Sequence, residues 1–147
     1  RAMEWAVWRK DRGDYETPCV IGAVIDLRNC LDLTNRSDLE LLGDAYASYT
    51  AEQELAGLRL PENKAVAGDP NEDRLLRYLD CAVIRHLHYI VEQQAGRENA
   101  PDAFDTVRGM FTEGGDLYSG AGFKQKSHTQ ISVRTPACIK GVFYPIE

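Results

Sequence analysis

The chain has 147 residues, of which 44% are hydrophobic and 27% are charged, and its formal net charge is −6. These values are typical of a folded globular protein, and we expect a single domain over residues 1–147. No apolar run approaches the ~20 residues that a membrane-spanning helix needs. The negative charge also disfavours a broad nucleic-acid interface, because such interfaces depend on neutralising phosphates.

The first part of the chain predicts a helix followed by strands. Residues 1–10 are rich in apolar and helix-forming residues, which predicts a helix that ends near Gly13. The segment PCVIGAVIDL is an almost unbroken apolar run of strand length, which predicts a central strand, Val20 to Leu27, buried on both faces. A short extended piece is expected over residues 29–33.

Two long helices are predicted next. Ser37 or Asp38 is placed to cap a helix that runs to about Ala56. A second helix is expected from about Asn71 to Gln94, with a glycine closing it at position 96. Each helix carries apolar residues at spacings of three and four that form a core stripe. These are Leu39, Leu42, Tyr46 and Tyr49 in the first, and Leu76, Leu79, Val83, Leu87 and Ile90 in the second.

At least three strands are predicted in the last third of the chain, within DTVRGMFT, TQISVR and CIKGVFYP. The order of a helix, a strand, two helices and then strands indicates an α+β fold. We expect a mainly antiparallel sheet with helices packed on it.

The cysteines and histidines of the chain are interpreted as structural. Four cysteines are widely spaced and mostly flanked by apolar residues, which predicts buried, reduced thiols in a cytoplasmic protein rather than a metal site. His86 and His88 lie two positions apart on the second helix and cannot share a face, so we expect buried or half-buried structural histidines rather than a metal-binding pair. The four cysteines are Cys19, Cys30, Cys81 and Cys138.

The strand TQISVR and the loop before it form the first candidate site. Strict alternation places His128, Gln130, Ser132 and Arg134 on one face of the strand. The preceding loop, residues 116–128, contains two glycines and the aromatic residues Tyr118 and Phe123, which could stack on a planar ring. A polar strand face after such a loop is typical of a ligand site, although a plain surface hairpin would have a similar sequence.

Basic residues near this strand indicate a contact for an anion. Arg108 lies in the middle of a predicted strand, where an arginine is costly to bury unless it is paired or faces a ligand. An ion pair with Glu113 or Asp105 is the alternative. Residues 124–140 contain four Lys and Arg residues and no acidic residue, so this segment could receive a pyrophosphate or could simply be solvated.

Three blocks of the sequence resemble a widespread, poorly characterised bacterial family. They are VIGAVIDL with CLDL, LDCAVI with LH, and the run from DTVRG to CIKG with its GAGF and KSH segments. Fuller members of that family begin with motifs that resemble the first two motifs of ADP-ribosyltransferases of the diphtheria-toxin and poly(ADP-ribose) polymerase type. The resemblance implies the C-terminal part of such a domain, lacking its N-terminal strands.

The resemblance also assigns roles to residues of the last third. In these transferases a glutamate on a late strand stabilises the cationic transition state, and Gln130 falls on its position. A glutamine can hydrogen-bond a ribose hydroxyl but carries no charge and cannot act as a base. His128 and Glu113 are the ionisable groups nearby that could substitute. Binding of NAD is assigned to Arg108, Lys126, Ser132, Tyr118 and Phe123, with the first two at the phosphates.

The function implied is binding of NAD and transfer of ADP-ribose to a macromolecular acceptor, in a toxin or anti-phage context. An antitoxin or other partner protein would fit that context, and no metal or membrane is expected. A non-catalytic NAD-binding or partner-binding regulatory module of the same fold is the first alternative. A structural domain whose basic segment docks a partner is the second.

Overall fold

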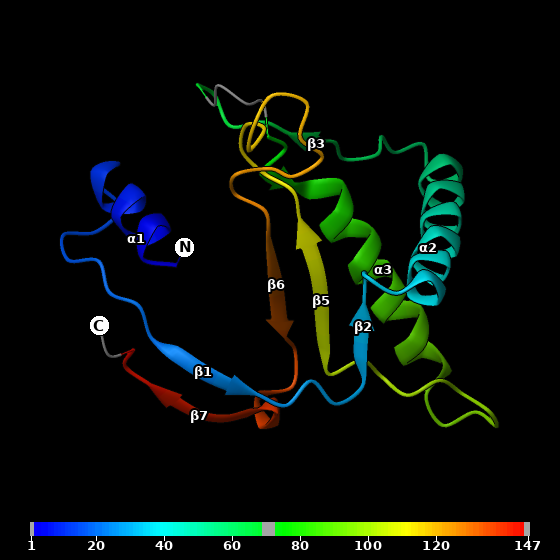
Figure 1. Cartoon of the computed structure of the whole chain (residues 1–147). Helices are drawn as coiled ribbons and strands as arrows, with labels where there is room; N and C mark the ends of the chain where they lie inside the picture. Colours follow the sequence, from blue (N-terminus) through cyan, green and yellow to red (C-terminus); the bar gives the residue numbers. More distant parts are fainter. Residues whose placement is uncertain (1, 69–72, 146–147) are drawn as a thin grey trace. The chain divides into compact units, whose positions relative to one another are not determined.

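The computed structural model describes residues 2–68 and 73–145 (Figure 1). The chain divides into two compact units. Residues 1–27 and 135–147 form the first, here called the terminal unit, and residues 28–134 form the second, the central unit. Among the described residues, no helix is both long enough and apolar enough to cross a membrane.

The terminal unit contains α1 (Ala2–Asp11), β1 (Gly22–Ile25), the 3-10 helix η1 (Pro136–Cys138) and β7 (Ile139–Phe143). The strand β1 pairs antiparallel with β7 in a two-stranded sheet. The prediction of a central strand buried on both faces is therefore wrong, because β1 has one strand neighbour among the described residues and Val24 is 56% exposed. The ring of Phe143 lies against the backbone at Gly22, so a Cβ atom at this position would clash with the ring.

The central unit is built on a three-stranded mixed sheet with the order β2-β5-β6 (Figure 1). The strand β2 (Cys30–Asp32) runs parallel to β5 (Thr106–Phe111), which pairs antiparallel with β6 (His128–Val133). The strands of the last third are thus confirmed, and so is the α+β class. The parallel β2–β5 pair makes this sheet mixed rather than purely antiparallel.

The two long helices pack on one face of this sheet. Side chains from α2 (Arg36–Leu55) and α3 (Tyr78–Gln94) form a common core with Leu31 of β2 and Val107 of β5. Because strand side chains alternate between faces, Asp32 and Arg108 point away from the helices. The buried core residues are Leu31, Ala45, Val83, Leu87, Val91 and Val107.

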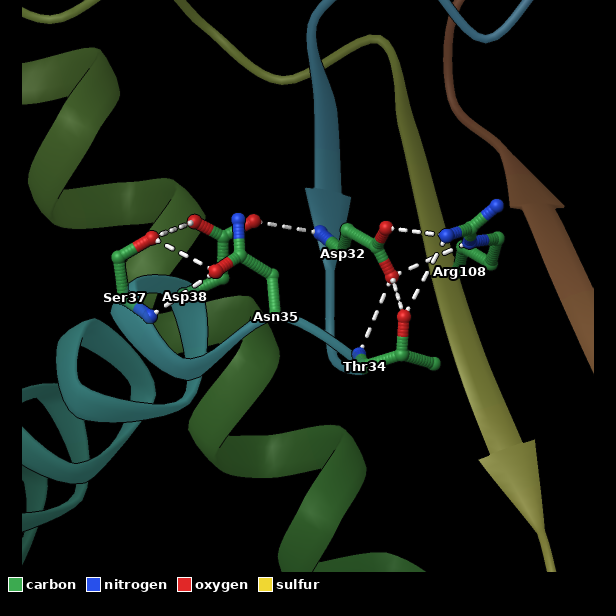
Figure 2. Close-up of polar contacts among 6 residues, drawn as sticks. All are labelled: Asp32, Thr34, Asn35, Ser37, Asp38 and Arg108. Atoms are coloured by element: carbon green, nitrogen blue, oxygen red, sulfur yellow. Dashed lines mark hydrogen bonds and ion pairs between the residues drawn. The ribbon is translucent and has the colours of Figure 1, made fainter.

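The start of α2 is fixed by a cap one residue before the helix. The side-chain oxygen of Asn35 accepts a hydrogen bond from the Ser37 backbone N–H at 3.1 Å. The prediction of Ser37 or Asp38 as the cap is therefore wrong. Asp38 instead accepts a hydrogen bond from the Asp32 backbone N–H at 2.8 Å, which ties α2 to β2 (Figure 2).

The start of α3 is capped by a residue that lies well before the helix in the sequence. The helix begins at Tyr78 rather than Asn71, which lies outside the described residues, and a short hairpin of β3 (Asn63–Lys64) and β4 (Leu76–Arg77) precedes it. The Asn63 side-chain oxygen accepts hydrogen bonds from the backbone N–H groups of Leu79 at 3.0 Å and Asp80 at 3.3 Å. At the other end Gly96 has a positive φ, as a closing glycine requires.

The buried histidines are confirmed, but the burial of the cysteines is not general. His86 lies against the Tyr49 ring and 3.2 Å from the Ser48 hydroxyl, while His88 meets the Phe104 ring. All four cysteines are free, yet Cys19 and Cys81 are exposed, Cys30 is half-buried and Cys138 is buried. Apolar neighbours in sequence did not predict burial, because adjacent positions on a helix or strand face different ways.

Candidate functional site

The strand β6 carries the predicted polar residues on one face. The register pairs Phe111 with His128, Gly109 with Gln130 and Val107 with Ser132, so all three polar residues share the sheet face on which α2 and α3 pack. His128 is half-buried, while Gln130 and Ser132 are exposed because β6 lies at the edge of the sheet, beyond the buried core.

His128 fixes the orientation of the Gln130 amide. The His128 Nδ1 atom lies 2.8 Å from the Lys126 carbonyl oxygen, and its Nε2 atom lies 2.8 Å from the Gln130 Nε2 atom. A carbonyl only accepts, so Nδ1 carries the proton and donates, and Nε2 accepts from the Gln130 amide N–H. The Gln130 Oε1 atom is left as an acceptor for a ligand hydroxyl or amide.

An aromatic ring and a guanidinium group stack in succession on the His128 ring. The Phe111 ring stacks on the His128 ring with centroids 6.0 Å apart, and the Arg77 guanidinium lies 4.4 Å from the Phe111 centroid. Arg77 also faces the carboxylates of Asp80 at 3.5 Å and Glu113 at 3.9 Å. Sequence reasoning missed Arg77, because it fell inside a helix that was predicted to start too early.

Glu113 reaches the same end of the sheet but is not exposed to a ligand as Gln130 is. The residue is only 8% exposed, and its carboxylate faces the Arg77 guanidinium. Its backbone carbonyl accepts a hydrogen bond from the Lys126 N–H at 2.8 Å, which closes the base of the loop. The structure therefore places Glu113 at the same end of the sheet as His128, and it holds the Glu113 carboxylate in an ion pair with Arg77.

Arg108 lies on the other face of the sheet, away from Gln130. Its Nε atom donates to Asp32 Oδ1 at 3.1 Å, and its Nη2 atom donates to Asp32 Oδ2 and, at 3.3 Å, to the Thr34 hydroxyl (Figure 2). Its partner is therefore Asp32, the residue opposite it in the β2–β5 register, rather than the two acids considered from the sequence. Hydrogen bonds from Arg108, and then from Thr34, lower the pKa of Asp32 to about 2.

The loop between β5 and β6 is held by its own hydrogen bonds. The Leu117 N–H donates to the Phe123 carbonyl at 3.0 Å, and Lys124 forms an ion pair with Asp116 at 2.6 Å. Tyr118 and Phe123 are 61% and 68% exposed. The loop thus presents two aromatic rings to solvent, as a ligand site or a plain surface hairpin would.

Three of the four basic side chains in residues 124–140 form ion pairs with described residues, and the fourth does not. Lys124 pairs with Asp116, Arg134 with Glu92 at 2.6 Å, and Lys140 with Asp26 at 3.4 Å. Lys126 is exposed and forms no ion pair with a described residue. Of the four basic residues in the segment, Lys126 is therefore the one available to an anion near Gln130.

An apolar groove of about 540 Å³ adjoins the stack from the helix side. Arg77 and Phe111 belong to its lining, which otherwise comes mainly from α2, α3 and the end of β5.

Over residues 2–68 and 73–145, no group of three or more His, Cys, Asp or Glu side chains is placed to hold a metal ion.

No model of a known protein family matches this chain, and neither a curated protein nor a solved structure matches it.

Proposed function

We propose that the chain belongs to an ADP-ribosyltransferase-like domain and binds NAD beside Gln130 of β6. The observation that carries the proposal is the Gln130 amide, which His128 orients so that Oε1 is free to accept a hydrogen bond. This acceptor lies on an exposed strand beside a loop with two exposed aromatic rings. The sequence resemblance supplies the identity of the ligand.

Each contact to NAD follows from what the neighbouring side chains offer. Gln130 Oε1 accepts a hydrogen bond from a ribose hydroxyl, and Ser132, two residues along the same face, adds a second polar contact. Lys126 contacts the phosphates, and Tyr118 or Phe123 stacks on a planar ring. Arg108 has no part in this proposal, because it lies on the opposite face and is bonded to Asp32.

Transfer of ADP-ribose would break the bond between the ribose C1′ atom and the nicotinamide nitrogen. Nicotinamide leaves with the bonding electrons, and an oxygen or nitrogen of a protein, a nucleic acid or water bonds to C1′ and releases its proton. A carboxylate near C1′ speeds this step by stabilising the developing positive charge. Gln130 lacks that charge, and the Glu113 carboxylate faces Arg77 instead.

These two features favour the second candidate, a domain of the same fold that binds NAD without rapid cleavage. The two functions are separated by measuring NAD affinity by calorimetry and nicotinamide release by chromatography on the same samples. Binding without release favours the regulatory module, and binding with release favours the transferase. Gln130→Ala should weaken binding, whereas Thr129→Ala, which points to the other face of β6, should not.

Absence of NAD binding in the folded wild-type chain would refute both candidates. Gln130→Glu tests the assignment of the catalytic position. If Gln130 stands beside C1′, the added carboxylate should raise the rate of nicotinamide release by ~100-fold or more, which is the effect of one well-placed electrostatic group.

A further inference from the structure

In the described part of the chain, one edge of β6 pairs with β5 and no strand pairs with its other edge, here called the open edge. The direction of the backbone hydrogen bonds identifies the residues that face this open edge. The Arg134 N–H donates to the Asp105 carbonyl at 2.9 Å, so Arg134 directs its backbone toward β5 at the end of the ladder. This direction alternates from residue to residue along an antiparallel strand, so Gln130 and Ser132 also direct their backbone groups toward β5. Thr129, Ile131 and Val133 therefore direct their N–H and C=O groups toward the open edge.

The hydrogen bonds between β2 and β5 agree with this assignment of the backbone directions in β6. The Arg108 carbonyl accepts a hydrogen bond from the Leu33 N–H at 2.8 Å, so Arg108 directs its backbone to the β2 side of β5. Arg108 stands opposite Ile131 in the register, as a non-hydrogen-bonded pair. In the described part of the chain, β5 is the strand paired with β6.

The sequence and register of β6 lack three features that commonly protect an edge strand. Lysines, prolines and bulges commonly prevent edges from pairing with other chains. The sequence HTQISV of β6 has no charged residue and no proline, and its register with β5 is continuous over all six residues. Ile131 at the middle of the strand is 45% exposed.

We propose that the open edge of β6 pairs antiparallel with β6 of a second copy of this chain, about a two-fold axis at Ile131. Ile131 then stands opposite Ile131 of the partner subunit, Thr129 opposite Val133 of the partner subunit, and Gln130 opposite Ser132 of the partner subunit. The backbone groups of Thr129, Ile131 and Val133, which point outward, form the new ladder. Two three-stranded sheets become one continuous sheet.

The side-chain pattern of β6 is the reason for choosing a second copy as the occupant. The five residues from Thr129 to Val133 read β-branched, polar, β-branched, polar, β-branched, which is symmetric about Ile131. Two-fold pairing therefore places β-branched residues together on the face away from α2 and α3, and polar residues together on the helix face. No like charges oppose each other within β6, so the strand is complementary to itself.

The pairing also adds a polar group beside the face that carries Gln130. Directly opposite residues of paired strands have Cβ atoms about 5 Å apart. Ser132 of the partner subunit would therefore lie next to Gln130 on the face that carries His128. The proposal itself rests on the edge of β6 and not on the binding of NAD.

Sedimentation equilibrium of the full chain, combined with hydrogen exchange of individual amides, tests the proposal. We expect a reversible dimer of the 16.5 kDa chain. As the concentration rises, the amides of Thr129, Ile131 and Val133 should become protected from exchange. Those of Gln130 and Ser132 should be protected at every concentration, because they bond to β5.

A charge exchange at the two-fold axis makes the test specific. Ile131→Lys and Ile131→Glu should each weaken self-association about tenfold or more, because like charges would meet across the axis. An equimolar mixture of the two variants should associate again, since opposite charges then meet. Met110→Lys, on the same sheet face but on the inner strand β5, is the matched control and should remain dimeric.

Three results would overturn the proposal. The first is a wild-type chain that stays monomeric at all concentrations. The second is a dimer that both Ile131 variants leave unchanged. The third is protection of the Thr129, Ile131 and Val133 amides in the monomer, which would show that the edge is covered within one chain.

Discussion

The cap that Asn63 places on α3 predicts a large effect from a small polar substitution. Asn63 accepts hydrogen bonds from the backbone N–H groups of Leu79 and Asp80, and its amide donates to the Asp80 carboxylate at 2.7 Å. Replacing an asparagine cap by alanine costs about 1 kcal/mol. Loss of a partly exposed hydrogen bond to a charged group adds about another 1 kcal/mol. We therefore expect Asn63→Ala to lower the free energy of unfolding by about 2 kcal/mol.

Urea unfolding followed by circular dichroism measures this change, with Lys64→Ala as the matched control. Lys64 is the next residue of β3, is exposed, and has no part in the cap, so its loss should change stability by less than about 0.5 kcal/mol. Asn63→Asp should fall between the two. It keeps an acceptor for the helix N-terminus but places a negative charge beside Asp80. An Asn63→Ala variant as stable as Lys64→Ala would refute the cap.

Three further predictions concern the central and terminal units. Because Arg108 lowers the pKa of Asp32, the pair stabilises the fold above the ordinary pKa of 3.8, and this contribution should be lost as the pH falls toward 2. Asp32→Asn should reduce that acid dependence in urea unfolding from pH 6 to 2, and an unchanged dependence would contradict the pairing. Leu87→Ala should cost about 2–5 kcal/mol, because Leu87 is 2% exposed in the core, and a loss below 1 kcal/mol would contradict its placement. A thiol reagent should modify exposed Cys81 in the native protein but buried Cys138 only on unfolding, as mass spectrometry of peptides would show, and equal rates would contradict this order.

Local patterns predicted the elements whose structure is decided locally. Alternation in TVRGMF and HTQISV identified β5 and β6 and the shared face of His128, Gln130 and Ser132, because side chains of a strand alternate whatever the strand pairs with. The stripe of α3 identified Val83 and Leu87 as core residues. Periodicity needs no knowledge of distant contacts.

Features that depend on distant contacts could not be predicted in this way. Asn63 caps α3 from 16 residues before Leu79, so the true start of the helix has no local signal. Arg108 meets Asp32 across 76 residues because β2 and β5 happen to pair in parallel. Arg77 enters the site only because α3 starts after it.

The exposure of β1 is a second feature that local sequence could not predict, because burial also depends on distant elements. An apolar run predicts burial only if other elements cover it, and β7 is the one strand that pairs with β1 among the described residues. Val24 is consequently exposed despite its apolar neighbours. Composition describes what a segment can bury, whereas topology decides what is buried.

The central claim is that NAD binds beside Gln130, and nuclear magnetic resonance of the full chain with added NAD tests it most directly. We expect saturable shifts of the Gln130 side-chain amide, the His128 ring and the Lys126 backbone, whose atoms are linked by the two 2.8 Å contacts. We also expect little change at Arg108, on the opposite face. Shifts concentrated around Arg108 and Asp32, or no saturable shift in a folded sample, would contradict binding of NAD beside Gln130.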